Sequence, residues 1–244
     1  MNSQADRFAV ATHLLGGSGR WQNLGLWPAP TYDAACEALA RKVGEAAHLR
    51  AGQRLLEVGA GRGTALDLWR DLYGVDPIGL DPHPRKIRPD LVAGPALHDG
   101  RLGLRGPFDA ILSVDAAYHF APLRAWLRAA FAELAPGGRL AFTTLVAKAP
   151  WSWLGRLADI PHGALVPRAA LTSHLAAVGF EDVHLEDLTR EVLGGFADHV
   201  ASLVPHRGPG WTKIALTARL ARIGSTTGAL AYLLVGARRP DRCL

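Results

Sequence analysis

Cysteine and methionine are scarce in this chain of 244 residues, which has two cysteines and one methionine. Cys36 and Cys243 lie far apart and lack the spacing of metal ligands, so the chain has no sign of a disulfide scaffold or a zinc site. It also lacks a basic start followed by an unbroken apolar core, and no apolar run approaches the roughly 18 residues that span a bilayer. We therefore expect a soluble, cytoplasmic protein without a membrane span.

Charge of one sign is not concentrated anywhere in the chain. The net charge is +5, but the arginines are scattered, and pairs such as Arg238-Arg239 are more typical of solvated surface than of a nucleic-acid patch. We therefore expect no nucleic-acid partner. With 49% hydrophobic and 20% charged residues, the chain can pack a core. Its length fits one α/β domain with an elaboration.

The most informative segment is a glycine-rich turn. Residues 54–58, Arg-Leu-Leu-Glu-Val, suit a strand buried on both faces of a parallel sheet. Gly59, Gly61 and Gly63 follow at alternate positions, before a helical pattern that begins at Thr64. Glycine tolerates positive φ and lets a ligand lie against bare backbone. The turn therefore predicts a pocket for the polar end of a nucleotide-like cofactor; the alternative is a glycine turn of no special purpose.

An aspartate ends the next expected strand, over residues 75–81. In a doubly wound sheet, the carboxyl ends of neighbouring strands face one crevice, so Asp81 is expected opposite the glycine turn. An ionised carboxylate is purely an acceptor and can bind both hydroxyls of a ribose. The alternative is that Asp81 caps a helix. A nicotinamide dehydrogenase would require the different glycine spacing G-x-G-x-x-G.

Three motifs in this order resemble the class I S-adenosylmethionine (SAM) methyltransferases. They are Glu-x-Gly-x-Gly-x-Gly from Glu57, Phe-Asp-x-Ile-x-Ser from Phe108 and Leu-x-Pro-Gly-Gly-x-Leu from Leu134. The resemblance covers residues 55–146, and the later elements match by order. It implies a doubly wound, Rossmann-like α/β fold with a mostly parallel seven-stranded sheet, whose last strand is antiparallel. It also implies an enzyme with SAM as cofactor, of the small-molecule type that includes sugar, sterol and tocopherol methyltransferases.

The resemblance extends to the residues expected to bind the cofactor. These are Glu57, Gly59, Ala60, Gly61, Gly63, Asp81, Pro82, Asp99 and Asp115. Glu57 is expected to hold the loop through backbone contacts rather than to touch the cofactor. Related enzymes usually carry an aspartate for the adenine amino group where this chain has Pro95. Asp99 or a backbone carbonyl is the expected replacement, although an exposed turn aspartate is an alternative reading of His98-Asp99-Gly100.

Candidate acid–base residues follow the expected strand over 108–114. His119 lies where some related O-methyltransferases keep a general base, and its ordinary pKa near neutrality suits removal of a hydroxyl proton. Asp115 is a second catalytic candidate, expected to orient His119 or to touch the substrate. Tyr118 is expected to line the pocket. The alternative for His119 is a purely structural role.

The whole chain, 1–244, is interpreted as a single methyltransferase domain. We divide it into an N-terminal arm or lid (1–50), a core (51–187 and 229–237) and a helical cap insertion (188–228) over the substrate. Further strands are expected over 91–96, 140–146, 180–187 and 229–237, and helices over 32–49, 122–135, 167–178, 196–203 and 211–223. The oligomeric state is not indicated.

Aromatic residues predict where the acceptor binds. The expected substrate residues are Trp21, Trp27, Tyr118, His119, Trp151, Trp153 and His162. Trp21 and Trp27 lie in the glycine-rich arm, and they either close over the site or simply pack on the core. Trp151 and Trp153 belong to a segment rich in tryptophan and proline, which lacks the lysine-rich polar face of a membrane-surface helix.

These observations lead to one function and two alternatives. We expect transfer of the SAM methyl group to a hydroxyl, or a carbon, of a mostly apolar small molecule such as a lipid or secondary metabolite. The alternatives are N-methylation of a small amine and a protein that binds SAM without catalysis. The sequence does not identify the acceptor.

Overall fold

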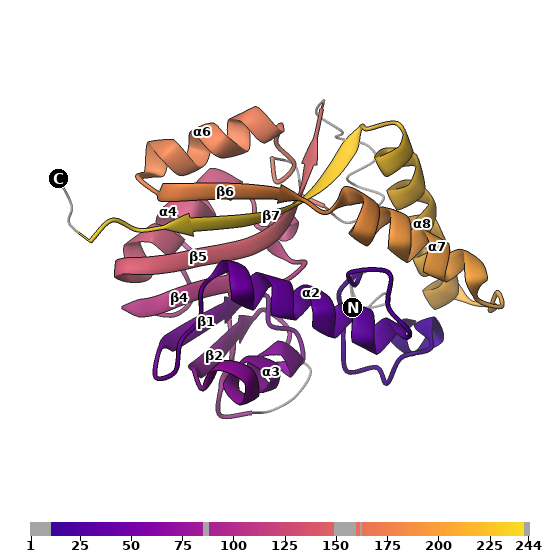
Figure 1. The fold of residues 1–244 in the computed structure, drawn as a ribbon, viewed down its shortest axis with the longest axis horizontal. Helices are drawn as coiled ribbons and strands as arrows, with labels where there is room; N and C mark the ends of the chain where they lie inside the picture. The colour runs from indigo at the N-terminus through magenta and orange to yellow at the C-terminus, as the bar shows by residue number, and fades with distance from the viewer. Residues whose placement is uncertain (1–10, 85–87, 149–159, 162, 242–244) are drawn as a thin grey trace.

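The computed structural model describes residues 11–84, 88–148, 160–161 and 163–241 (Figure 1). Its centre is one seven-stranded sheet in the order β3-β2-β1-β4-β5-β7-β6. The strands are β1 (Arg54–Val58), β2 (Asp76–Asp81), β3 (Leu91–Ala93), β4 (Phe108–Ser113), β5 (Leu134–Ala147), β6 (Glu181–Asp187) and β7 (Leu230–Arg238). β7 lies between β5 and β6 and is antiparallel to both, while β1 to β5 pair in parallel. The expected fold class is confirmed.

Helices cover both faces of the sheet. α2 (Tyr32–Ala46) and α3 (Thr64–Tyr73) lie on the face nearer the viewer in Figure 1, and α4 (Leu123–Glu133) and α6 (Arg168–Val178) lie on the other. Each face has its own hydrophobic core, because alternate residues of the buried strands point to opposite sides. Leu55 packs in the α2 core, for example, and Leu56 in the α4 core.

Local signals fixed the ends of several elements. The Thr31 hydroxyl accepts the Ala34 N–H at 3.1 Å and caps α2, and Gly179 ends α6 with a φ of 105°. β5 differs from expectation, because it begins at Leu134 instead of residue 140. Phe108 pairs with Leu134 across an irregularity, and the positive φ of Gly137 lets the expected Pro-Gly-Gly turn continue the strand as a bulge.

The segment between β6 and β7 is helical, as expected. It contains a π-helical turn, η3 (Arg190–Gly194), followed by α7 (Gly195–Ser202) and α8 (Pro209–Thr226). Figure 1 shows α7 and α8 beyond one end of the sheet, beside the N-terminal segment that contains the short helix η1 (Thr12–Leu15). Among the described residues, no helix combines the length and apolar character needed to cross a membrane.

Candidate active site

The glycine turn after β1 is a tight cradle. Gly59, Gly61 and Gly63 have φ values of 80°, 55° and 72°, a region that favours glycine. The N–H groups of Gly59 and Ala60 both donate to Leu80 O, at 2.8 and 3.2 Å, which ties the turn to the end of β2. A Cβ on Gly59 would lie 2.5 Å from the Ala116 Cβ. Glycine is therefore required here for both conformation and space.

Asp81 faces the glycine turn across the ends of β1 and β2. Its Oδ2 accepts the Gly61 N–H at 2.8 Å, and its Oδ1 accepts the His83 N–H at 2.8 Å. Each carboxylate oxygen retains capacity for a further donor. The adjacent Pro82 is exposed. Sequence and structure thus bring the two halves of the expected cofactor site together.

Glu57 lies in β1 just before the turn and is 3% exposed. Its Oε2 is buried without a hydrogen-bond partner. Burial, and secondly the charge of Asp81, raise the pKa of Glu57 to about 8. Buried polar atoms normally have partners. An orphan oxygen beside a glycine cradle fits a site that receives the polar end of a ligand such as SAM.

Asp115, just beyond the end of β4, receives three hydrogen bonds. Its Oδ1 accepts from the Tyr118 hydroxyl at 2.9 Å and the Tyr232 hydroxyl at 2.7 Å, and its Oδ2 accepts the Leu24 N–H at 2.7 Å. Its backbone has a φ of 54°, which is uncommon outside glycine and often found at functional sites. Burial raises the pKa of Asp115 to about 6, although these three bonds act in the opposite direction.

Tyr232 was not found by sequence reasoning. It lies in β7, is completely buried, and its hydroxyl is also 2.9 Å from Thr143 Oγ1 in β5. Thr143 Oγ1 in turn accepts the Asp115 N–H at 2.7 Å. The only available signal was a single tyrosine in an otherwise aliphatic strand, since a buried tyrosine hydroxyl usually has a polar partner.

His119 lies in a short 3₁₀ helix, η2 (Ala117–His119), and is exposed. Its ring centroid is 4.6 Å from that of Tyr118. Tyr118 itself is 9% exposed, with its hydroxyl directed at Asp115. The sequence predicted that Asp115 orients His119. Among the described residues, Tyr118, Tyr232 and Leu24 donate hydrogen bonds to the Asp115 carboxylate.

Asp99 has a local role. Its side chain is 88% exposed, lies 3.2 Å from His98 Nδ1, and belongs to a tight turn closed by hydrogen bonds between His98 and Arg101. This is the turn aspartate that the sequence offered as the alternative. Its contact with adenine stays a prediction.

The N-terminal arm crosses the candidate site. Arg20 O accepts the Thr64 hydroxyl at 2.8 Å, and the Gln22 side-chain oxygen occupies the space that a Cβ on Gly61 would need. Leu24 N–H donates to Asp115, and Trp27 N–H donates to Glu191 O at 3.1 Å. The arm therefore connects the glycine turn, the end of β4 and the cap.

The aromatic residues of the arm are core residues in this structure. Trp21 and Trp27 are 8% and 9% exposed and belong to the hydrophobic cluster under α2. The other expected aromatic contacts, Trp151 and Trp153, lie outside the described residues, as does His162. Their predicted contact with the acceptor stays a prediction.

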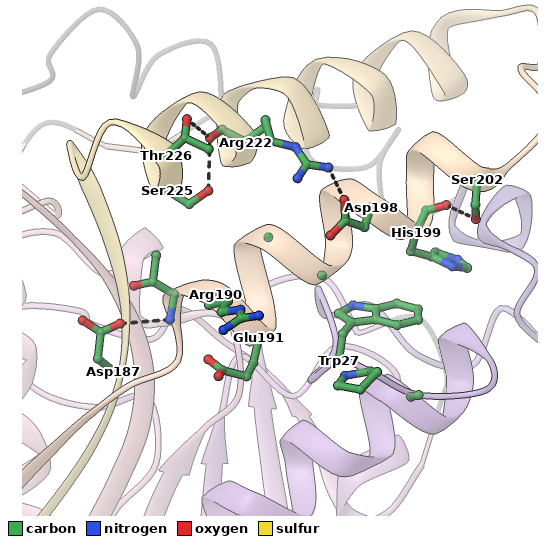
Figure 2. Close-up of a pocket in the computed structure, with 15 residues that line it drawn as sticks. Trp27, Asp187, Arg190, Glu191, Asp198, His199, Ser202, Arg222, Ser225 and Thr226 are labelled. Atoms are coloured by element: carbon green, nitrogen blue, oxygen red, sulfur yellow. Dashed lines mark hydrogen bonds and ion pairs between the residues drawn. The ribbon is translucent and has the colours of Figure 1, made fainter.

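A cavity of about 940 Å³ lies between the arm and the cap (Figure 2). Trp27 lines it and stacks on His199, with ring centroids 4.4 Å apart. Asp198 and Arg222 form an ion pair across its α7–α8 side. The glycine turn, Asp81 and Asp115 do not line this cavity. Within the described residues, no His, Cys, Asp and Glu side chains are grouped as metal ligands.

Several known proteins are similar to this chain. A family model described as a methyltransferase domain matches residues 32–185. Erythromycin 3''-O-methyltransferase of Saccharopolyspora erythraea is 26% identical over 212 residues, which cover 74% of this chain and 68% of that protein. Ubiquinone biosynthesis O-methyltransferase of Nitrobacter winogradskyi is 32% identical over 122 residues, 46% of each chain. The crystal structure of the 4+2 cyclase SpnF matches in fold, with a TM-score of 0.74 and 19% identity over 99% of this chain and 97% of that one.

Proposed function

Because this chain belongs to the methyltransferase domain family and is a SAM-dependent methyltransferase, we propose that it methylates a hydroxyl group of a mostly apolar small molecule, such as a lipid or secondary metabolite. The observation that carries this proposal is the carboxyl group of Asp115. It lies at the carboxyl end of β4, next to the glycine turn, and has a raised pKa of about 6. A carboxylate with that pKa is a better proton acceptor than an ordinary aspartate.

The residues that would hold the cofactor are those of the cradle: Gly59, Gly61 and Gly63 through bare backbone, and Asp81 through its remaining acceptor capacity. Glu57, buried in β1 just before the turn, would support the loop. When bound, SAM would supply a methyl group attached to a sulfonium. The carbon–sulfur bond would break with its electron pair going to sulfur, and an electron pair of the acceptor would form the new bond to the methyl carbon. The protein then has to orient the acceptor, exclude water and receive a proton.

A hydroxyl acceptor must lose its proton, and two side chains are candidates to receive it. Asp115 is partly buried and held by three donors. His119 is exposed in η2. We propose Asp115 as the base, because it is fixed in place beside the cradle. His119 is the alternative base, and it lies exposed in η2.

The names of the two relatives support a hydroxyl acceptor. Both are O-methyltransferases, and one is named for erythromycin. We propose that the acceptor lies under the cap of residues 188–228 and that the cavity beside Trp27 receives the part of it remote from the reacting hydroxyl. This arrangement is supported by Trp27, which lines the cavity and whose indole N–H donates to Leu24 O at 3.0 Å. The Leu24 N–H in turn donates to Asp115.

The test is transfer of a labelled methyl group to a panel of hydroxylated, amine and alkene small molecules. We expect product with hydroxylated acceptors. Asp115→Asn is expected to lower kcat by about 100-fold or more while affinity for S-adenosylhomocysteine (SAH) changes less than about threefold. His119→Ala provides the comparison. A larger loss in His119→Ala than in Asp115→Asn would assign the base to His119.

An amine acceptor is the second candidate, because a partly buried carboxylate that has no cationic partner among the described residues also suits an ammonium group. Methylation confined to amines in the panel would establish this alternative. Binding of SAM and SAH by calorimetry, without transfer to any acceptor, would instead indicate a protein that no longer catalyses.

A further inference from the structure

Tyr232 connects the reaction edge of the sheet to the cap. Its side chain reaches Asp115 Oδ1 at 2.7 Å and Thr143 Oγ1 at 2.9 Å. Its main chain is fixed as well: Tyr232 N–H donates to the Thr189 hydroxyl, and Tyr232 O accepts the Leu188 N–H, both at 2.9 Å. The phenol is therefore held rigidly at the point where β4, β5 and β7 meet.

The groups that face Asp115 are neutral donors. Tyr118 donates from η2 and Leu24 N–H from the arm, and Tyr32 and Cys36 lie on α2 within electrostatic range. Burial raises the pKa values of Tyr32, Tyr118 and Tyr232 well above their usual range, so their hydroxyls remain protonated at neutral pH. Among the described residues, no lysine or arginine pairs with Asp115. Within this part of the chain, the hydrogen bonds from Tyr232, Tyr118 and Leu24 are what stabilise its ionised form.

The two oxygens of Asp115 are not equivalent. A carboxylate oxygen has about two acceptor sites, and Oδ1 uses both for Tyr118 and Tyr232. Among the described residues, only the Leu24 N–H donates to Oδ2. Oδ2 therefore has one site left, which is where an acceptor hydroxyl would place its hydrogen.

We propose that Tyr232 is a positioning residue of the methyl-transfer reaction, whose hydroxyl anchors Oδ1 of Asp115 so that Oδ2 receives the proton of the acceptor. The proton moves from the acceptor oxygen to Oδ2, the electron pair of the O–H bond stays on that oxygen, and Asp115 becomes a neutral acid. The catalytic consequence rests on the proposed function. The effect of Tyr232 on the titration of Asp115 does not.

Tyr232→Phe removes the hydroxyl and retains the ring that fills the core. Loss of one hydrogen bond to the ionised carboxylate raises the pKa of Asp115, because a bond to a charged group favours that form. We expect the ¹³C NMR titration of the Asp115 carboxyl, in cofactor-free protein, to move up by about one pH unit. The acidic limb of the pH profile of kcat/KM moves by the same amount, and activity near pH 9 recovers to within about threefold of wild type.

The matched control is Tyr73→Phe, which removes a hydroxyl from α3 at a site that has no contact with Asp115. It is expected to leave both titrations unchanged. If Tyr232→Phe does not fold, replacement of Tyr232 by 3-fluorotyrosine keeps the ring and the hydroxyl. Its more acidic hydroxyl is a stronger donor, so the pKa of Asp115 moves down.

Two results would overturn the inference: an Asp115 titration that is the same in Tyr232→Phe and wild type, or a loss of activity by one factor at every pH. Failure of the proposed function gives a different result from failure of this inference. In that case the wild type transfers no methyl group to hydroxyl acceptors, but Tyr232→Phe still shifts the NMR titration of Asp115. Unchanged SAH affinity in the variant, within about twofold, excludes damage to the cradle.

Discussion

At the scale of single residues, Glu57 is a carboxyl group whose charge conflicts with its buried surroundings. Its pKa is raised to about 8, chiefly by burial, against an ordinary value of 4.5. Well below pH 4.5 the carboxyl is neutral in both folded and unfolded chains, so it makes no pH-dependent contribution to stability. Between about 4.5 and 8 the unfolded chain ionises first, so the free energy of unfolding falls as pH rises and then levels off.

Glu57→Gln should remove this dependence in cofactor-free protein. At pH 9 we expect the variant to be more stable than wild type by roughly 2 kcal/mol. The substitution removes the cost of ionising a buried carboxyl, which is roughly 5 kcal/mol at most, but the buried amide that replaces it has a cost of its own. Near pH 5 the two proteins should differ little. Urea unfolding at both pH values measures the difference.

Glu37→Gln on α2 is the control for Glu57→Gln. Glu37 forms a half-exposed ion pair with Arg41, so its replacement should cost less than about 1 kcal/mol at either pH. Parallel stability curves for Glu57→Gln and wild type between pH 5 and 9 would show that Glu57 is already ionised near its ordinary pKa.

Whether a residue of the candidate site could be predicted depends on whether local or long-range contacts position it. The glycines and Asp81 were predictable, because a strand, a turn and the next strand place them by local rules. Tyr232 was not, since 117 positions separate it from Asp115 and only the antiparallel entry of β7 brings the two together. The shift of Glu57 depends on complete burial, which a single strand pattern does not specify.

At the scale of elements, the order and type of helices and strands followed from periodicity, caps and turn residues. The ends were less predictable where tertiary pairing extended an element. β5 begins at Leu134 because β4 and the chain after β7 hold the Pro-Gly-Gly segment, and Gly137 N–H donates to Arg239 O at 3.1 Å. The π-helical turn η3 also had no sequence signal. Such turns are often found at functional sites, and this one lines the cavity under the cap.

Gly194, at the end of η3, offers a direct way to fill that cavity. Its backbone is helical, with a φ of −63°, and a Cβ there would meet nothing within 4 Å. Gly194→Leu should therefore fold normally and even favour the helix. If the acceptor extends into the cavity, we expect its KM to rise by about tenfold, with kcat and SAH affinity nearly unchanged.

Ala201→Leu is the matched control for Gly194→Leu. Ala201 lies on the exposed side of α7, the helix that follows η3, and outside the cavity. Both variants add a leucine to the cap, but only one blocks the space beside Trp27. An equal KM in the two variants would show that the acceptor does not use this cavity.

At the scale of the whole molecule, the N-terminal arm joins parts of the chain that are distant in sequence. Four successive N–H groups, of Leu24, Gly25, Leu26 and Trp27, donate to Asp115, Asn23, Ala35 and Glu191. These bonds connect residues 24–27 of the arm to the end of β4, to α2 and to the cap. Sequence patterns indicated an arm, but not this attachment, because single backbone donors have no residue signature.

This attachment predicts how the cofactor exchanges. The Gln22 side chain lies against Gly61, so a ligand in the cradle must pass or displace it. Gln22→Ala opens that route without altering the backbone bonds of the arm. We expect the association and dissociation rate constants of SAH each to rise by about tenfold. The reason is that the substitution lowers the barrier to exchange but keeps most contacts of the bound state. Stopped-flow tryptophan fluorescence measures both rates.

Gln53→Ala is the control for Gln22→Ala. Gln53 lies at the opposite end of β1, where its side chain accepts the Arg50 N–H at 2.7 Å. Its replacement should leave both rates unchanged. Equal rates in both variants and wild type would mean that the cofactor enters by a path that avoids the arm.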